Sequence, residues 1–409
     1  MTDPQTSPEP GADAAQPPRR GVRRRGLLVG SGLAVAGLGA GVVGTHGAEA
    51  LRDARTEPAL VPFHGDHQAG VATPIQAHGV FAAFDLHRET DREAARRLLV
   101  LLSDDAERLM RAEPAIADQE PELATTPARL TVTVGFGPGW FTALGLEERT
   151  PTGFADLPAF DIDRLQDRWS GGDLLLQVAA DDPTVLSHAV RHLSKTARSF
   201  ATPRWMQRGF TTAMTTPDSP TPRNLFGQVD GTVNPRSGND FADVVWSAEP
   251  GWFAGGTTVV LRRIAMNLDT WDELDVVDKE LSIGRRLSDG SPLTGTREED
   301  PVNLTATDSS GLPVIPRFAH AARAHARRED ERFLRRSFNY DDGLRDGHAD
   351  VGLVFAAYQA DLTRQFLPVQ QRLAAEDMLN TWTVPIGSAV FVIPPGCRPG
   401  GFLGEGLLR

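Results

Sequence analysis

Apolar and polar positions alternate along the chain in two similar series of elements. Runs of period 2 predict strands, and runs of period 3.6 predict helices. The first series comprises a strand at 80–86, a helix at 90–111, strands at 130–136 and 173–179, a helix at 183–198 and a strand at 205–210. Its order is β-α-β-β-α-β, which is typical of a ferredoxin-like unit.

The second series repeats this order, with a long polar insertion rich in Gly, Asp and Ser after its first helix. It comprises a strand at 257–267, a helix at 271–283, strands at 333–340 and 352–358, a helix at 362–375 and a strand at 389–393. We therefore predict an α+β fold of two ferredoxin-like βαββαβ halves, covering residues 51–222 and 223–409. The boundary lies in a Pro- and Thr-rich stretch at 215–223.

Residues of types that favour helix starts indicate where two of the predicted helices begin. Thr90 is expected to cap the helix at 90–111. Asp182 is expected to cap the helix at 183–198, with Pro183 at its first position.

The first fifty residues have the composition of a disordered segment followed by an export signal. Residues 1–18 are rich in Pro, Ala and acidic residues. Arg23 to Arg25 then precede an apolar, Gly-rich stretch, and Ala48-Glu49-Ala50 resembles a cleavage site. We expect a cleaved twin-arginine signal peptide, the twin-arginine translocation machinery as a partner and an extracellular, periplasmic or cell-surface location. The alternative is one membrane anchor, which the many glycines disfavour.

Charge and cysteine content exclude several functions. The chain has 42 Lys and Arg against 54 Asp and Glu, a net charge of −12 that repels phosphate backbones, so no nucleic-acid partner is expected. The single cysteine, Cys397, excludes an intramolecular disulfide and a thiolate zinc site. Ten histidines leave metal chemistry with nitrogen and oxygen ligands open.

Four motifs point to one kind of chemistry when they are taken in order. Asn224 to Pro235 contains a GxxDG sequence, which alone is weak because Asp-Gly is common in turns. The other three are Phe63 to Gly70 (FHGDHQAG), Ile315 to His320 (IPRFAH) and Phe333 to Tyr340 (FLRRSFNY).

Together these motifs resemble those of the dye-decolourising peroxidase family, in its exported, deferrochelatase-like subgroup. The resemblance extends from Phe63 to Arg409. It implies a duplicated ferredoxin-like fold that forms one haem-binding unit, with haem b as the cofactor and its site in the C-terminal half. Matched by position, His320 is the proximal iron ligand, Asp230 the distal acid and Arg335 the distal arginine. Gly227 and Gly231 shape the loop over the haem.

These residue types suit peroxide chemistry. A neutral imidazole such as that of His320 can hold haem iron and leave the opposite face open. An ionised Asp230 can carry a proton from one oxygen of the peroxide to the other. Arg335 stays protonated and can stabilise the negative charge that develops on the leaving oxygen.

Each assignment has a competitor in the sequence. His325 could replace His320 as the ligand. Arg336 adjoins Arg335, and their side chains should point to opposite faces of a strand, so only one can reach the haem. His67 is either a haem-edge contact or a loop residue. Cys397 is interpreted as an inert or exposed thiol.

The hydrogen-bond partner of the proximal histidine departs from the family pattern. Relatives often have a carboxylate before the last strand, where this chain has Asn380-Thr381-Trp382. The sequence therefore leaves the partner of His320 open. An imidazole without a carboxylate acceptor would have less imidazolate character, which would raise the iron potential.

The resemblance implies an exported haem peroxidase that uses hydrogen peroxide to oxidise bulky aromatic or dye-like donors by one-electron steps. Electrons from donors too large to reach the iron would pass through Trp or Tyr side chains. A second hypothesis is a haem-handling protein that releases iron from haem for uptake. A third is a ferredoxin-like module without a cofactor.

Overall fold

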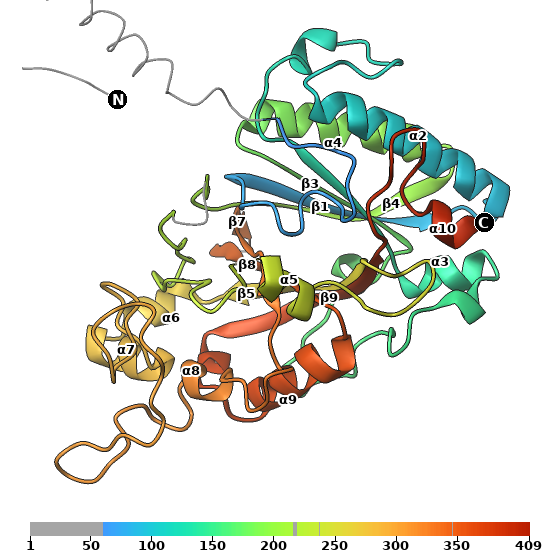
Figure 1. The fold of residues 1–409 in the computed structure, drawn as a ribbon. Helices are drawn as coiled ribbons and strands as arrows, with labels where there is room; N and C mark the ends of the chain where they lie inside the picture. The colour runs from blue at the N-terminus through green and yellow to red at the C-terminus, as the bar shows by residue number, and fades with distance from the viewer. Residues whose placement is uncertain (1–59, 216–218, 237, 346) are drawn as a thin grey trace, which may run out of the picture. The chain divides into compact units, whose positions relative to one another are not determined.

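The N-terminal half contains the predicted βαββαβ series. Its elements are β1 (His78–Leu86), α2 (Arg92–Met110), β2 (Thr131–Phe136), β3 (Leu174–Ala180), α4 (Pro183–Ala197) and β4 (Ala201–Phe210). The antiparallel strand order is β2-β3-β1-β4. In Figure 1, α2 and α4 lie side by side on one face of this sheet. The protein is described as a computed structural model over residues 60–409, except 216–218, 237 and 346.

The C-terminal half repeats the arrangement around β5. Its main elements are β5 (Thr257–Met266), α6 (Leu268–Asp272), α7 (Val276–Ile283), β6 (Leu334–Arg335), β7 (Phe338–Arg345), β8 (His348–Gln359), a π-helical turn (Leu362–Phe366), α9 (Leu367–Glu376) and β9 (Thr383–Ile393). The strands run in the order β9-β5-β8-β7, and β6 also pairs with β8. The predicted fold class, two ferredoxin-like halves, is confirmed.

Short helices connect or follow the main elements. They are α3 (Pro138–Ala143), α5 (Gly238–Val244), α8 (His320–Arg323), α10 (Glu405–Leu408) and 3-10 turns at Pro121–Leu123, Glu147–Arg149, Asp167–Trp169 and Met378–Thr381. Among the described residues, no helix is both long and apolar enough to span a membrane. The predictions for residues 1–50 lie outside the described residues.

The two sheets join at both edges. One pair of residues, Phe136 and Val392, connects β2 to β9, and another, Phe210 and Asn339, connects β4 to β7. Eight strands therefore follow one another in a closed circle. Its inner faces contribute a shared core that includes Phe81, Leu175, Leu261, Tyr358 and Phe391.

Three local predictions were wrong, and one of them is the strand predicted at 333–340, which is divided into β6 and β7. Asp91, not Thr90, caps α2 by accepting a hydrogen bond from the Ala94 backbone nitrogen, while the Thr90 hydroxyl donates to Phe200. The helix predicted at 271–283 is two helices, because Asp275 begins a second one by accepting from the Asp278 nitrogen. Asp182 caps α4 as predicted.

The only two tyrosines, Tyr340 and Tyr358, are fully buried. Burial raises the pKa of both phenols far above the usual range. A tyrosine in the unfolded chain ionises at about pH 10. Above that pH the folded protein therefore keeps the two phenol protons that the unfolded chain has lost. Stability should fall by about 1.4 kcal/mol per pH unit for each tyrosine. Tyrosinate absorbance and circular dichroism during an alkaline titration should change together; tyrosine ionisation in a folded protein would contradict this.

Candidate active site

A cavity of about 440 Å³ lies against the C-terminal half. Its walls come from β5, β8, α9 and the loop that contains the GxxDG motif. The apolar residues lining it include Phe226, Val229, Ile264, Met266, Ile283, Leu353, Phe355, Phe366, Val369 and Leu373. Asp230, Arg335 and His320, which sequence reasoning selected separately, all line this one cavity.

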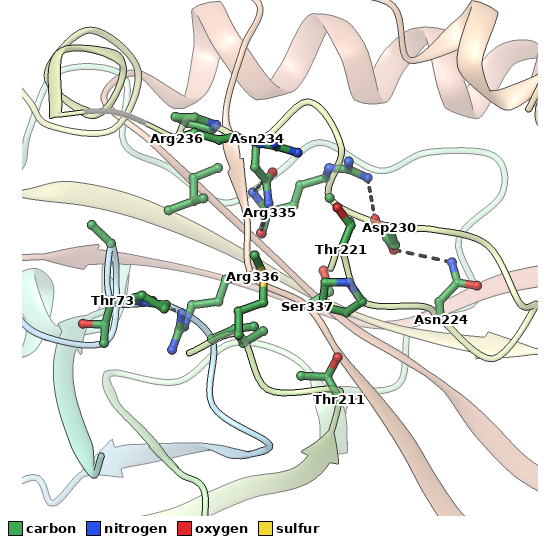
Figure 2. Close-up of a pocket in the computed structure, with 18 of the residues that line it drawn as sticks. Thr73, Thr211, Thr221, Asn224, Asp230, Asn234, Arg236, Arg335, Arg336 and Ser337 are labelled. Atoms are coloured by element: carbon green, nitrogen blue, oxygen red, sulfur yellow. Dashed lines mark hydrogen bonds and ion pairs between the residues drawn. The ribbon is translucent and has the colours of Figure 1, made fainter. Parts of the chain in front are cut away.

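Asp230 and Arg335 form an ion pair in the cavity wall. Arg335 Nη1 donates to Asp230 Oδ1 at 2.7 Å, and Asn224 Nδ2 donates to the other carboxylate oxygen at 3.4 Å. Asn234 fixes the backbone of Arg335: its Nδ2 donates to the Arg335 oxygen at 2.7 Å, and its Oδ1 accepts from the Arg335 nitrogen at 3.0 Å. Figure 2 shows Arg335 extending toward Asp230. The pair is thus held by both side-chain and backbone contacts.

The two motif glycines give the loop its shape. Both have positive φ, +79° at Gly227 and +136° at Gly231, in the region that disfavours side chains. A Cβ on Gly231 would also lie 3.2 Å from Thr221 Cγ2. Neither glycine lines the 440 Å³ cavity itself, but both lie in the turn whose neighbouring residues, including Val229 and Asp230, do line it.

His320 begins α8 and has a carboxylate partner. Its Nδ1 donates to Asp377 Oδ2 at 2.6 Å, and Asp377 Oδ1 accepts from the Leu379 nitrogen at 3.0 Å. Burial alone would lower the pKa of His320, but the charge and hydrogen bond of Asp377 outweigh it, so the pKa lies above the usual value. His320 Nε2 makes no hydrogen bond to a described residue and is free to bind a metal.

This pairing answers a question that the sequence left open, the partner of His320. The acceptor comes three residues before Asn380, at the end of α9. An acidic residue is unfavourable at the C-terminal end of a helix, so Glu376-Asp377 in the sequence was a usable signal. A carboxylate acceptor makes an imidazole more basic than one without such a partner.

His325 and Arg336, the competing candidates, have surroundings that differ from those of His320 and Arg335. His325 lines the same cavity, but it is exposed and pairs with no carboxylate among the described residues. Arg336 turns away from the cavity and donates to the Thr73 backbone oxygen and to Gln76 Oε1. The expected alternation of Arg335 and Arg336 is therefore observed.

Two other candidates lie outside this cavity. His67 donates from Nδ1 to the Gly255 oxygen at 2.7 Å and stacks on Trp246 with 3.8 Å between ring centroids, as a structural loop residue does. Cys397 is buried, not exposed, and burial raises its pKa to about 11, which makes the thiol unreactive at neutral pH.

Comparisons with known proteins agree with this geometry. Family models described as "Dyp-type peroxidase, N-terminal" and "Dyp-type peroxidase, C-terminal" match residues 68–211 and 221–398. A dye-decolorizing peroxidase of Thermobifida fusca is 39% identical, with 96% of this chain and 98% of that protein covered. A deferrochelatase of Yersinia pestis is 34% identical, with 85% of each chain covered.

Solved structures give the same result. A DyP-type peroxidase from Cellulomonas bogoriensis is 50% identical with a TM-score of 0.83, covering 86% of this chain and 99% of that one. DtpA from Streptomyces lividans, solved in ferric and oxyferrous forms, is 42% identical with a TM-score of 0.82, covering 86% of this chain and 98% of that one. The chain belongs to the Dyp-type peroxidase family and is a haem-dependent peroxidase.

The residues present fit a haem group. The cavity offers an extended apolar wall, and His320 presents a free Nε2 whose ring orientation is fixed by Asp377. This donor set, one imidazole and no thiolate, is that of a histidine-ligated haem. The structure thus supplies a ligand and an enclosing apolar cavity.

Proposed function

We propose that this protein is an exported haem b peroxidase that oxidises bulky aromatic or dye-like donors by one-electron steps. The observation that carries the proposal is the Asp230–Arg335 ion pair in the same cavity as the Asp377-supported His320. Membership of the family establishes the peroxidase activity. The donor class, the haem type and the roles of these residues are our inference.

His320 would hold the haem iron through Nε2. Arg285 also lines the cavity and would bind a carboxylate of haem b. In the described part of the chain its side chain donates to two backbone oxygens, of Gly290 and Glu298, and forms no ion pair, so its charge is available for a ligand. Arg332 lines the cavity too, but it already pairs with Asp240 at 3.2 Å. When bound, the haem supplies the iron at which peroxide is reduced. The sequence had not singled out Arg285.

Asp230 and Arg335 would have different roles in the reaction with peroxide. An ionised Asp230 takes a proton from one peroxide oxygen and delivers it to the other, which then leaves as water. Arg335 provides a permanent positive charge beside that oxygen. The hydrogen bond from Asn224 and the ion pair with Arg335 keep the Asp230 carboxylate in one orientation for this transfer.

Replacing Asp230 with Asn tests the proton transfer. The Asp230→Asn variant should react with peroxide more slowly than the wild type, by about a hundredfold or more, because it has no carboxylate to accept the proton, and it should keep a normal haem content. The measurement is the second-order rate of haem absorbance change after mixing with peroxide. A variant that reacts at the wild-type rate would rule out this role.

The deferrochelatase relatives favour a second function, release of iron from haem. The same cavity and the same proximal histidine would serve it. Product analysis separates the two functions: peroxidase turnover yields oxidised donor with the porphyrin still metallated, whereas iron release yields metal-free porphyrin. Dye turnover without free porphyrin would support our proposal.

We also propose that the chain leaves the cytoplasm through the twin-arginine route with its haem already bound. The support is the arginine cluster at 23–25, the apolar stretch after it and Ala48-Glu49-Ala50. Export that continues after Arg24 and Arg25 are both changed to lysine would overturn this proposal.

A further inference from the structure

A second cavity, of about 150 Å³, lies beside β6. Asp230 and Arg335 line both this cavity and the larger one. We call the second cavity the rear cavity. A cavity of about this volume holds a benzene ring. Much of its wall is apolar, contributed by Val71, Ile75, Met214, Phe241, Leu334 and Leu353. Its size and walls therefore suit one six-membered ring.

More arginines than carboxylates line the rear cavity. Among the described residues, four arginines and one carboxylate, Asp230, line it, and Asp230 pairs with Arg335. In the described part of the chain, the side chains of the other three arginines donate to neutral oxygens. These contacts are Arg223 to the Gly227, Leu287 and Ser288 backbone, Arg236 to the Thr232 backbone, and Arg336 to Thr73 and Gln76.

Arg336 is the most unusual of the three because it is only 4% exposed. Its Nε has no hydrogen-bond partner in the described part of the chain. Burial lowers its pKa to about 10, which still leaves it charged at neutral pH. Arg336 donates to no carboxylate among the described residues. A buried charge that forms no ion pair is costly, and a bound anion would offset part of that cost. Figure 2 shows Arg336 and Arg335 extending in different directions at this cavity.

We propose that the rear cavity is a binding site for a monocyclic aromatic carboxylate. The ring would contact the apolar walls, and the carboxylate would interact with the field of Arg223, Arg236 and Arg336. A hydrated inorganic anion has no apolar surface to match these walls, so the site favours an organic one. The proposal does not require catalysis.

Calorimetry tests the proposal on the haem-loaded ferric protein without peroxide. Benzoate is the probe, and benzamide is its neutral counterpart of the same shape. Benzoate should bind at one site, at least about tenfold more tightly than benzamide, because a buried charge-assisted contact contributes that much. Measurement without peroxide keeps this result separate from the success or failure of the proposed peroxidase roles.

Three variants locate the site. Met214→Trp should fill the rear cavity and abolish benzoate binding, while an unchanged haem spectrum shows that the protein is folded. Arg236→Gln removes an exposed charge at the cavity and should weaken binding about two- to fivefold. The matched control is Arg208→Gln, an exposed arginine on β4 outside the cavity, which should leave the affinity unchanged.

Several results would overturn the proposal. One is the absence of benzoate binding, and another is equal affinity for benzoate and benzamide. Wild-type affinity in Met214→Trp would place the benzoate elsewhere. Equal weakening by Arg236→Gln and Arg208→Gln would show a general charge effect and no specific site.

Discussion

The Arg335→Leu variant should react with hydrogen peroxide about a hundred to a thousand times more slowly than the wild type at every pH. Removing one donor that stabilises a developing negative charge typically costs about 2.7 to 4 kcal/mol. Arg335 keeps its charge throughout the working range, so the charge that it supplies is lost from the variant at every pH. The measurement is the second-order rate of haem absorbance change after rapid mixing with peroxide.

Arg208→Leu is a suitable control for the loss of an arginine, since Arg208 lies on β4 away from both cavities. It should react at the wild-type rate. If Arg335→Leu and Asp230→Asn both react like the wild type, neither residue performs peroxide chemistry, and the iron-release function becomes the better explanation of the site.

The His320→Ala variant should be purified with little or no haem. On the proposed assignment the imidazole would supply the protein's bond to iron, and Asp377 holds the ring in position. Haem content is measured as the ratio of haem absorbance to protein absorbance after expression with added haem precursor.

His325→Ala is the matched control because His325 lines the same cavity five positions further along the chain. It should retain the haem. The opposite pattern, with haem lost from His325→Ala and kept by His320→Ala, would show that the ligand is His325.

The order of elements could be predicted because each depends on local periodicity. The apolar segment 173–179 lies within one residue of β3, and the pattern at 183–198 is close to the observed α4. The joining of the two sheets could not be predicted, because it depends on single pairings, Phe136 with Val392 and Phe210 with Asn339, between distant parts of the chain. No local pattern marks such pairs.

In the site, too, features that depend on local sequence could be predicted, and contacts between distant residues could not. Strand alternation predicted that Arg335 and Arg336 face different ways, and their hydrogen bonds agree. Asp377 was missed because it lies 57 residues from His320 and meets it only through the packing of α8 on α9. Arg285 was missed because nothing in its local sequence distinguishes it from other arginines beside a polar loop.

β9 both closes the circle of strands and completes the wall of the larger cavity. It pairs along β5 from Met266 with Thr383 to Thr257 with Ile393, and its Thr383 and Pro385 line the 440 Å³ cavity. A chain still being synthesised lacks this strand until residue 393 has emerged from the ribosome. A chain truncated before β9 would therefore have neither the closed circle of strands nor a complete cavity.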